Sequence, residues 1–480
     1  MITKQPIFVA GKWIQTAGEI SVRDPWTGKI TARVSAAGEE EIEKAIRSAV
    51  EAFSRYRNWA SFERAGLLQR IHDGVRKEAE PLAQLILRES GKPITLARGE
   101  VSRTLHTFQT AAEEARRFGG DLLPLDLQSD SRGRFGLYRR FPIGPVLAIT
   151  PFNFPLNLAA HKVAPALAVG NAVLLKPAPQ TPISVLRLAR ICEKAGLPPG
   201  VMSVLPAGPE AIRPAIKDPR IQMISFTGSA AVGWGLKEAS GKKKVVLEMG
   251  GNAAVLVDQD ADLKAAARRI ARGAFVYAGQ TCISVQRILI HQKVYAPFLR
   301  RFLSVTRKEI KTGNPRDPRV LAGPLINLEA VERVLSWIEE AKRAGAKILA
   351  GGRKRGKNFI EPTVLEKVPH GLPLSGQEVF GPVVLVEPVE NFSEAVRRAN
   401  DTRYGLQCGV FTNTLDHVLE AYEKLDVGGV MINDYSTYRS DPMPYGGTKD
   451  SGFGREGVRY AMEEMTEPKL LVVRKSRWEN

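Results

Sequence analysis

Short runs of apolar, mostly β-branched residues alternate with longer amphipathic stretches between residues 144 and 258. Each run is continuously hydrophobic, which is typical of strands buried on both faces of a parallel sheet. The stretches between the runs have the length of helices that cross over such a sheet. The predicted strands are 144–150, 172–177, 202–206, 222–228 and 243–251, and the predicted helices are 156–170, 182–196, 210–216 and 230–240.

Three loops follow the carboxyl ends of predicted strands. They read TPFNFP (150–155), KPAPQTP (176–182) and FTGSAAVG (226–233). Parallel strands place their carboxyl ends at one edge of a sheet, and ligands bind at that edge in open α/β folds. We therefore expect the three loops to lie together and to contact a ligand.

The second half of the chain repeats the alternation less regularly. Helices are predicted at 260–277, 294–310, 329–345 and 392–400, and strands at 285–291, 383–387, 408–412 and 428–433. This pattern indicates a second α/β domain that begins near residues 250–258. Two more strand-like segments, 119–140 and 467–477, belong to neither alternation of strands and helices. They could pair with each other or with another subunit, since exposed strand edges invite aggregation.

Length and composition describe an ordinary core-forming protein of roughly two or three domains. The 480 residues are 44% hydrophobic and 25% charged. Three cysteines without CxxC spacing form no disulfide framework and fit a reducing, cytoplasmic compartment. The start, MITKQPIFVAGKWIQ, lacks the apolar core of a signal peptide, and no run reaches the ~18 apolar residues that a membrane span needs. We expect no membrane partner.

The net charge of +18 raises the question of nucleic-acid binding. The basic residues are mostly scattered, with short clusters at 242–244 and 353–355, and no recognition motif accompanies them. We expect no nucleic-acid partner and interpret the charge as a solvated surface that can steer anionic ligands. The six histidines lack HExxH or paired-ligand spacing, so no metal site is predicted.

The segment YAGQTCISVQR (277–287) places one cysteine between an Ala-rich stretch and a β-branched run. A lone cysteine is more often a small buried hydrophobe than a reactive group. A nucleophile instead needs an accessible sulfur on a rigid segment of backbone. Cys282 lies between a predicted helix and a predicted strand, where such a segment is expected. From this segment alone both interpretations stay open.

Three polar side chains each have a structural and a chemical interpretation. Asn153, between aromatics and prolines, could cap the next helix or present its amide to a developing oxyanion. Glu248 ends an apolar strand, where burial raises a carboxyl pKa toward the range of a general base, but it could also pair with lysines 242–244. Glu378, in SGQEVFGPVV, suits a ribose hydroxyl or a turn.

Two features at the same predicted edge suit a phosphate or a ribose. Gly228 and Ser229 leave backbone N–H groups free at a helix N-terminus, which favours an anion such as a pyrophosphate. The turn is neither GxGxxG nor a P-loop, so alone it is a weak signal. Lys176 ends a buried strand, where an unpaired ammonium is costly; it could reach the surface or hold a ribose or phosphate.

The order of these motifs is more specific than any one of them. A rigid Asn, a strand-end Lys, a Gly-Ser turn, a strand-end Glu, a junction Cys and a Glu-Val-Phe-Gly-Pro loop occur at 153, 176, 228, 248, 282 and 378. From FVAGKW near residue 8 to PYGGTKDSGFGREG at 444–457, the chain resembles the aldehyde dehydrogenase superfamily. TPFNFPLNLAAHKVAPALAVGNAV with PMPYGGTKDSG looks like its branch of lactaldehyde, phosphonoacetaldehyde and non-phosphorylating glyceraldehyde-3-phosphate dehydrogenases.

The resemblance implies a fold and an assembly. It implies an α/β protein with a Rossmann-like parallel sheet in an NAD(P)-binding domain, residues 1–118 and 141–250. A second α/β domain, residues 251–440, would be catalytic. A small β arm, residues 119–140 and 460–480, would join subunits into a homodimer or homotetramer.

The resemblance also implies a catalytic set. Cys282 would attack the aldehyde carbon to give a thiohemiacetal, whose oxyanion the Asn153 side chain and the Cys282 backbone N–H would meet. Hydride transfer to the nicotinamide would leave a thioester, and Glu248 would activate the water that releases the acid. Lys162, in HKVAPAL, matches a lysine with a supporting role.

Further residues match the family's cofactor and substrate positions. Lys176 and Glu378 match positions that bind the adenosine ribose and the nicotinamide ribose, and Ser229 matches the pyrophosphate site. The other expected cofactor contacts are Ile149, Thr150, Pro151, Phe152, Pro179, Gly208, Phe226, Thr227, Gly228, Gly233, Met249, Gly250 and Phe380. The expected substrate contacts are Phe154, Thr281, Ile283 and Arg439.

Two positions bear on cofactor and substrate choice. NAD-preferring relatives often carry a glutamate three residues after the cleft lysine, where this chain has Pro179, so both NAD and NADP should be usable. Relatives that use phosphorylated aldehydes tend to have an arginine before the nucleophile, where this chain has Thr281. We expect a small polar or hydroxylated aldehyde as substrate, with Arg439 at the channel mouth.

Other functions fit parts of the sequence. A non-phosphorylating glyceraldehyde-3-phosphate dehydrogenase is the alternative within the branch. A CoA-acylating dehydrogenase would release the thioester to CoA, but such relatives usually lack the strand-end glutamate found at Glu248. A cysteine hydrolase would need His161 or His291 beside the thiol. A non-catalytic protein on a retained scaffold is disfavoured by the intact set of motifs.

Overall fold

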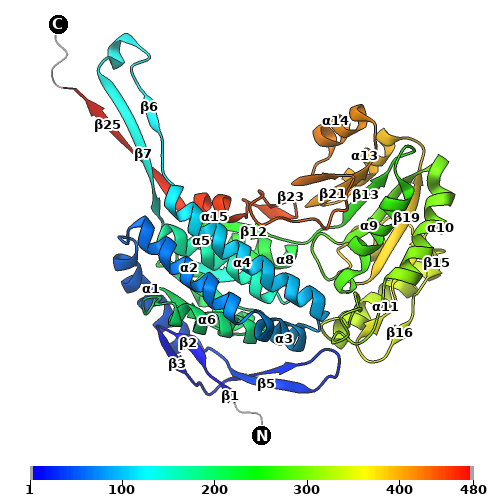
Figure 1. The fold of residues 1–480 in the computed structure, drawn as a ribbon, viewed down its shortest axis with the longest axis horizontal. Helices are drawn as coiled ribbons and strands as arrows, with labels where there is room; N and C mark the ends of the chain where they lie inside the picture. Colours follow the sequence, from blue (N-terminus) through cyan, green and yellow to red (C-terminus); the bar gives the residue numbers. More distant parts are fainter. Residues whose placement is uncertain (1–3, 476–480) are drawn as a thin grey trace.

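The continuous apolar runs of residues 144–251 form the centre of an eight-stranded sheet in the computed structural model, which describes residues 4–475 (Figure 1). In spatial order its strands are β24 (Gly452–Phe453), β12 (Lys244–Glu248), β11 (Met223–Thr227), β8 (Val146–Ile149), β9 (Val173–Lys176), β10 (Met202–Val204), β2 (Ile7–Val9) and β3 (Lys12–Ile14). The five central strands are parallel and antiparallel strands close both edges. All their residues but Lys244 are buried, which explains why the runs do not alternate.

Helices pack against this sheet in two tiers. Helices α1 (Glu39–Tyr56), α5 (Pro155–Val169), α6 (Ile183–Lys194) and α8 (Ala230–Ala239) contact the strands. Helices α2 (Ser61–Lys77), α3 (Ala79–Ser90) and α4 (Ile94–Arg117) lie outside them against α5 and α6, and α7 (Pro209–Lys217) packs on α1 and α8. A separate small sheet is formed by β1 (Lys4–Gln5), β5 (Ile30–Ser35) and β4 (Glu19–Arg23).

The strand order of the large sheet reverses between β8 and β11. From β8 the chain proceeds to β9 and β10 on one side, and then crosses to β11 and β12 on the other. A reversal of this kind leaves a crevice outside the carboxyl ends of the two strands, where ligands bind. Here the loops that begin at Thr150 and Gly228 border that crevice, as the sequence predicts.

The second lobe is built on a seven-stranded sheet, parallel except for β15. Its spatial order is β15 (Lys347–Ala350), β18 (Thr363–Glu366), β19 (Val383–Val389), β14 (Val285–His291), β13 (Ala253–Val257), β21 (Gln407–Phe411) and β22 (Gly429–Ile432). Its helices are α9 (Leu263–Phe275), α10 (Gln292–Glu309), α11 (Leu328–Arg343), α12 (Pro373–Gly376), α13 (Phe392–Asn400) and α14 (Leu415–Lys424). Two-residue ladders join β16 (Lys354–Arg355) to β17 (Phe359–Ile360) and β20 (Tyr404–Gly405) to β23 (Thr448–Lys449). The sequence prediction omitted β13, β15 and β18 of this sheet.

The two isolated strand-like segments pair with each other and form an arm that projects from the first lobe (Figure 1). Strand β25 (Thr466–Arg474) pairs antiparallel with β7 (Arg134–Pro142), and β6 (Leu122–Pro124) lies on the other side of β7. The expectation of strand throughout 460–480 is wrong at its start, because α15 (Val458–Glu464) buries Val458, Ala461 and Met462 at helical spacing. Residues 1–3 and 476–480, at the ends of the predicted domains, lie outside the described residues.

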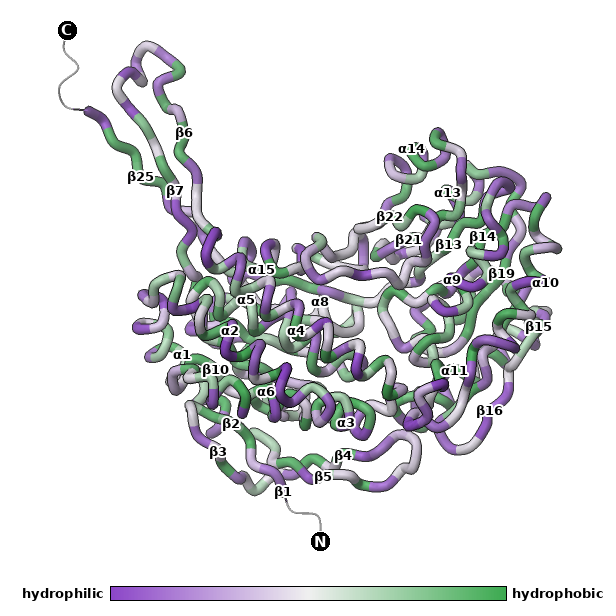
Figure 2. The backbone as a smooth tube through the Cα atoms, viewed as in Figure 1, coloured by the Kyte–Doolittle hydropathy of each residue, from purple (hydrophilic) through white to green (hydrophobic). Residues whose placement is uncertain are grey.

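Apolar residues concentrate in the strands of both sheets and in the α5 helix (Figure 2). One core cluster surrounds the first sheet and its helices, and separate clusters fill the second lobe. Between residues 4 and 475, no helix is both long enough and apolar enough to cross a bilayer.

Candidate active site

A cavity of about 690 Å³ opens where the ligand edge of the first sheet meets the second lobe. Most of the residues predicted for the site line it, although they come from six separate stretches of sequence. These are Pro151, Phe152, Asn153, Phe154, Thr227, Gly228, Ser229, Glu248, Met249, Gly250, Thr281, Cys282, Ile283, Glu378, Phe380 and Arg439. The structure thus brings five of the six ordered motifs, all but Lys176, together in one cavity.

Cys282 reaches the cavity. Its side chain is partly exposed there, whereas Cys192 and Cys408 are buried elsewhere in the core, so the packing interpretation does not hold for Cys282. Its Sγ lies 3.0 Å from the hydroxyl of Tyr445. Removal from water raises the pKa of the Cys282 thiol to about 11.

The backbone of the segment before Cys282 is tightly constrained. Tyr277, Ala278 and Gly279 all have left-handed backbone angles, with φ of 56°, 54° and 69°. A Cβ at Gly279 would lie 2.2 Å from the Gly381 carbonyl oxygen, so only glycine fits. The Gln280 side chain donates to the Tyr277 and Pro324 carbonyls and accepts from the Ile326 N–H, which fixes the loop from three sides.

Asn153 joins the two lobes. Its Nδ2 donates to the Gln280 carbonyl oxygen over 3.0 Å, and one amide hydrogen remains for the cavity. The alternative role as a cap of α5 is wrong, because the Ncap residue is Phe154 and no side chain of the helix start caps it. Glu100 on α4 satisfies that helix end instead, by accepting from the Leu156 and Asn157 N–H groups.

Glu248 ends β12 as a buried carboxyl group. Neither of its oxygens has a hydrogen-bond partner within residues 4–475. The alternative pairing with lysines 242–244 is not formed, and Lys244 instead pairs with Glu467 at 2.7 Å. Burial, with a further contribution from the Glu456 carboxylate, raises the pKa of Glu248 well above its usual range.

The far end of the cavity suits a phosphate and a ribose. Ser229 is the Ncap residue of α8, and the first turn of that helix, including Ala230 and Ala231, lines the cavity. Lys176 does not line the cavity, but it is buried at the end of β9, at the same edge of the sheet, without an ion pair to any described residue, and burial lowers its pKa. An uncompensated ammonium at this edge favours an anionic or polyhydroxyl ligand.

Glu378 and Phe380 belong to a loop of the second lobe that closes over this end. Glu378 accepts from the Gly251 N–H at 3.3 Å, and burial raises its pKa to about 8. A Cβ at Gly250 would lie 2.2 Å from a Glu378 carboxyl oxygen, so the approach of the two loops requires glycine. The Phe380 ring meets Phe152 edge-on with centroids 5.7 Å apart.

Some predicted residues lie outside the cavity lining, namely Ile149, Thr150, Lys162, Lys176, Pro179, Gly208, Phe226 and Gly233. Ile149 and Thr150 are buried at the end of β8, Pro179 follows β9, and Gly208 is the Ncap residue of α7. Phe226 and Gly233 pack beneath the turn, against the Gly228 and Met249 positions respectively.

Lys162 is fully buried behind the cavity wall. Its ammonium donates to Glu456 at 2.6 Å and to the Ser225 hydroxyl at 3.1 Å. The structure therefore places Lys162 outside the cavity lining, in contact with Glu456.

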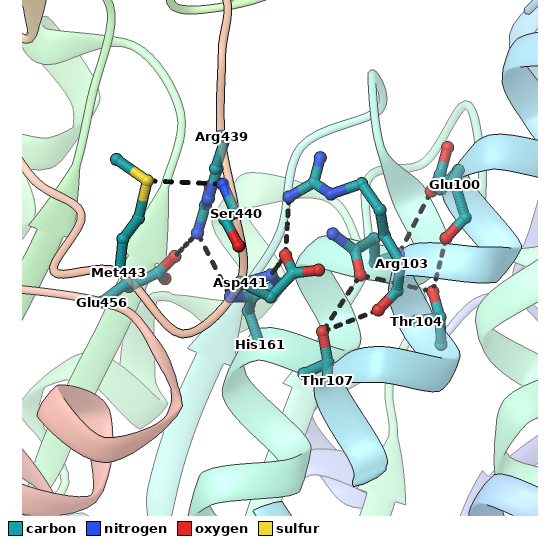
Figure 3. A network of polar contacts seen from close by, with 11 residues as sticks. Glu100, Arg103, Thr104, Thr107, His161, Arg439, Ser440, Asp441, Met443 and Glu456 are labelled. Carbon is teal, nitrogen blue, oxygen red and sulfur yellow. Dashed lines mark hydrogen bonds and ion pairs between the residues drawn. The ribbon is translucent and has the colours of Figure 1, made fainter. Parts of the chain in front are cut away.

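A buried polar network behind the wall contains residues that the sequence prediction missed (Figure 3). Arg103 on α4 donates to Asp441 at 2.7 Å, and Asp441 lies 2.8 Å from His161. Arg439 contacts the other His161 nitrogen at 3.2 Å and Glu456 at 3.3 Å. Burial lowers the pKa of His161, which favours its neutral form.

No sequence signal marks Arg103, one of 69 basic residues, as a cavity residue. Tyr445 lies within the motif PYGGTKDSGFGREG, so that motif could have drawn attention to it. The sequence does not show, however, that the hydroxyl of Tyr445 contacts the Cys282 sulfur.

A part-exposed cysteine and a buried carboxyl group line one cavity at the ligand edge of a doubly wound sheet, in a two-lobed α/β protein. The chain belongs to the aldehyde dehydrogenase family, whose sequence profile matches residues 13–471.

Individual relatives match over nearly the full chain. The 3-sulfolactaldehyde dehydrogenase of Priestia aryabhattai is 42% identical over 468 residues, which are 97% of each chain. The crystal structure of aldehyde dehydrogenase 21 from Physcomitrella patens, in complex with the reaction product succinate, has a TM-score of 0.96 at 42% identity and covers 100% of both chains. The glyceraldehyde-3-phosphate dehydrogenase GapN from Methanocaldococcus jannaschii, complexed with NADP, has a TM-score of 0.91 at 38% identity and covers 96% of this chain and 100% of its own.

Cysteine accessibility gives a direct test of this site. Iodoacetamide should modify the native protein once, at Cys282, and the denatured protein at all three cysteines. Because burial raises the Cys282 pKa, the native rate should keep rising with pH beyond the ordinary thiol value of about 8.5. Intact mass and peptide mapping measure both, with Cys282→Ser as control. Native modification of Cys192 or Cys408 would contradict the assignment.

Proposed function

We propose that Cys282, Asn153 and Glu248 carry out the NAD(P)-dependent oxidation of a small aldehyde to its carboxylic acid. The observation that supports this most is their convergence on one cavity from the ends of β8 and β12 and the start of β14. The three groups are the nucleophile, oxyanion donor and general base that the reaction requires.

The residues at the far end of the cavity fit a dinucleotide. The open N-terminus of α8 suits a pyrophosphate, and Lys176 and Glu378 suit ribose hydroxyls or a phosphate. A nicotinamide bound there would supply the hydride acceptor that oxidation of the aldehyde carbon requires. Pro179 offers no carboxylate to repel a 2′-phosphate, so we propose that NADP is used as well as NAD.

Cys282 begins the reaction as a thiolate. Its sulfur forms a bond to the carbonyl carbon and the π electrons move to oxygen, where the free Asn153 N–H and the Cys282 backbone N–H stabilise the charge. The oxidised carbon is then a thioester on Cys282. Glu248 takes a proton from a water molecule that attacks this thioester, the C–S bond breaks, and the thiolate is restored.

Replacing Glu248 should separate reduction of the cofactor from hydrolysis of the thioester. In Glu248→Gln, one equivalent of reduced cofactor should form rapidly and turnover should then fall roughly a hundredfold or more, since general-base catalysis is worth 10²–10⁴-fold. Wild-type turnover should rise with pH, because the base works only above its raised pKa. Stopped-flow absorbance of the reduced nicotinamide measures both. Full steady-state activity without a burst would contradict the role of Glu248.

We propose that the substrate carries an acidic group besides its aldehyde. Arg103 and Arg439 both line the cavity, and the Nε atom of each has no partner among the described residues. The ion pairs that they form with the residues behind them join three cations (Arg103, Lys162 and Arg439) to two carboxylates (Asp441 and Glu456), so these pairs carry one more positive than negative charge. A buried surplus of positive charge favours an anionic substituent.

The named relatives are consistent with this substrate class. Sulfolactaldehyde and succinate, which the relatives' names carry, both bear an acidic group. Thr281 stands where relatives that use phosphorylated aldehydes tend to have a third arginine, so a sulfonate or carboxylate fits better than a phosphate ester. We therefore propose an aldehyde with a sulfonate or carboxylate group as substrate in preference to glyceraldehyde-3-phosphate.

Arg103 should discriminate between anionic and neutral aldehydes. Arg103→Gln should raise KM for an aldehyde bearing a sulfonate or carboxylate roughly tenfold or more, because a charge-assisted hydrogen bond is lost. The kinetic constants for glycolaldehyde should change little. Arg213→Gln, which alters an exposed arginine on α7, is the matched control. A preference of the wild type for long neutral alkanals would refute the proposed substrate class.

Two rival functions lose support at this site. A cysteine hydrolase needs a histidine at the thiol, yet His161 is held by Asp441 and His291 accepts from the Lys293 N–H of α10. A CoA-acylating enzyme has no need of the buried Glu248 carboxyl group.

We propose that the β arm joins subunits into a homodimer or homotetramer. Strand β25 is at the edge of the arm sheet, and Leu470, Leu471 and Val472 on it are each about half exposed. A long apolar edge of this kind favours a partner.

The arm can be tested without touching the cavity. Leu471→Asp should lower the molar mass in solution, measured by light scattering after size exclusion, because it places a charge on the apolar edge. Lys469→Asp, on the same strand, controls for the added acidic group. An unchanged mass for Leu471→Asp would contradict the role of the arm.

A further inference from the structure

The hydroxyl of Tyr445 is the hydrogen-bonding partner of the Cys282 sulfur. The two atoms are 3.0 Å apart, and within residues 4–475 no other hydrogen bond reaches this sulfur. Tyr445 is buried, and its backbone is fixed on both sides, because its N–H donates to the Glu456 carbonyl and its carbonyl accepts from the Glu456 N–H. The phenol is therefore held against the sulfur.

A cation lies on the face of the same ring. The Arg439 guanidinium carbon is 3.6 Å from the Tyr445 ring centroid. Glu456 and His161 hold that guanidinium in place, and its side chain is almost fully buried. A cation at a ring face attracts the π electrons. The ring then withdraws electron density from its oxygen, and the phenol becomes a stronger hydrogen-bond donor.

The nucleophile needs such a donor. A thiolate, not a thiol, attacks carbonyl groups, and an apolar cavity disfavours the charged form. Cysteine enzymes commonly meet this cost with a histidine or lysine beside the sulfur. No histidine or lysine of the described chain hydrogen-bonds to Cys282. The hydroxyl of Tyr445 is the side-chain group that hydrogen-bonds to the sulfur instead.

We propose that Tyr445 is a catalytic residue that stabilises the Cys282 thiolate by donating its hydroxyl hydrogen bond, and that Arg439 strengthens this donor through the ring. The inference rests on the proposed function of Cys282 as nucleophile. The thiol proton leaves to solvent and the phenol keeps its own. Consistent with this, burial raises the pKa of Tyr445 well above its ordinary value, and the Tyr445 contact opposes the rise that burial causes in the pKa of Cys282.

The test removes one oxygen atom and keeps the ring. The rate of Cys282 alkylation by iodoacetamide is measured against pH in the protein without cofactor or aldehyde, for the wild type and for Tyr445→Phe. We expect the apparent pKa of alkylation to rise by roughly one unit or more in Tyr445→Phe, so that the rate near neutral pH falls about tenfold or more. The value of kcat/KM should fall by a similar factor and recover as pH is raised.

Tyr295→Phe is the matched control. Tyr295 is in the second lobe, and its hydroxyl donates to Glu366 rather than to a cavity residue. It should leave the alkylation profile unchanged. Arg439→Gln should also raise the alkylation pKa, and since no aldehyde is present, this effect is separate from substrate binding. An unshifted profile in Arg439→Gln would overturn the contribution of the ring cation.

The outcomes separate the roles that Tyr445 could have. An unshifted alkylation profile in Tyr445→Phe would overturn the proposal, whether kcat/KM is unchanged, as for a packing residue, or KM alone rises, as for a contact to a substrate hydroxyl. Cys282→Ser distinguishes this failure from failure of the proposed function. If Cys282→Ser is inactive while Tyr445→Phe behaves as the wild type, only the Tyr445 proposal fails. If Cys282→Ser remains active, the proposed function fails.

Discussion

One hydrogen bond, from the Asn153 amide to the Gln280 carbonyl, joins the two lobes at the candidate active site. Asn153 follows β8 of the first sheet and Gln280 precedes Cys282 in the second lobe, so this contact joins the two loops that carry the amide and the thiol. Buried supports hold each side. Glu100 fixes the helix after Asn153, and its ion-pair partner Lys92 lies over the rings of both Phe154 and Tyr277, one from each loop. The proposed reaction depends on these two loops not moving apart.

The charges behind the cavity form a connected set rather than isolated pairs. Isolated buried ions are costly, and loss of one partner from a buried pair typically costs about 3–5 kcal/mol. Glu456 lies at the centre of the set, between Lys162 and Arg439, and remains charged because both cations face it. Glu248, close to the same carboxylate but without a pairing partner, is pushed toward its neutral form. The pKa values of two glutamates of one chain are thereby shifted in opposite directions through their surroundings alone.

Much of the site could be predicted from the chain because it depends on local patterns. Continuous apolar runs specify buried parallel strands, and the loops after them fall at one edge by geometry. Asn153, Glu248 and Cys282 were found in this way, each at the end of a strand or at a junction. The prediction failed where the local pattern was ambiguous. Residues 460–464 have apolar positions that suit either a helix or the start of a strand, and burial against the first lobe decides for the helix.

The sequence by itself determined the order of strands and helices, the ligand edge and the motifs that belong there, because each follows from side-chain periodicity and chain direction. Only the tertiary structure decided which distant side chains meet. Arg103 enters the cavity wall, Lys162 turns away to Glu456, and the hydroxyl of Tyr445 reaches Cys282 across 163 positions of sequence. The physical reason is that charge, burial and hydrogen bonding act through space. A residue's chemistry is therefore fixed by neighbours that its own stretch of sequence does not contain.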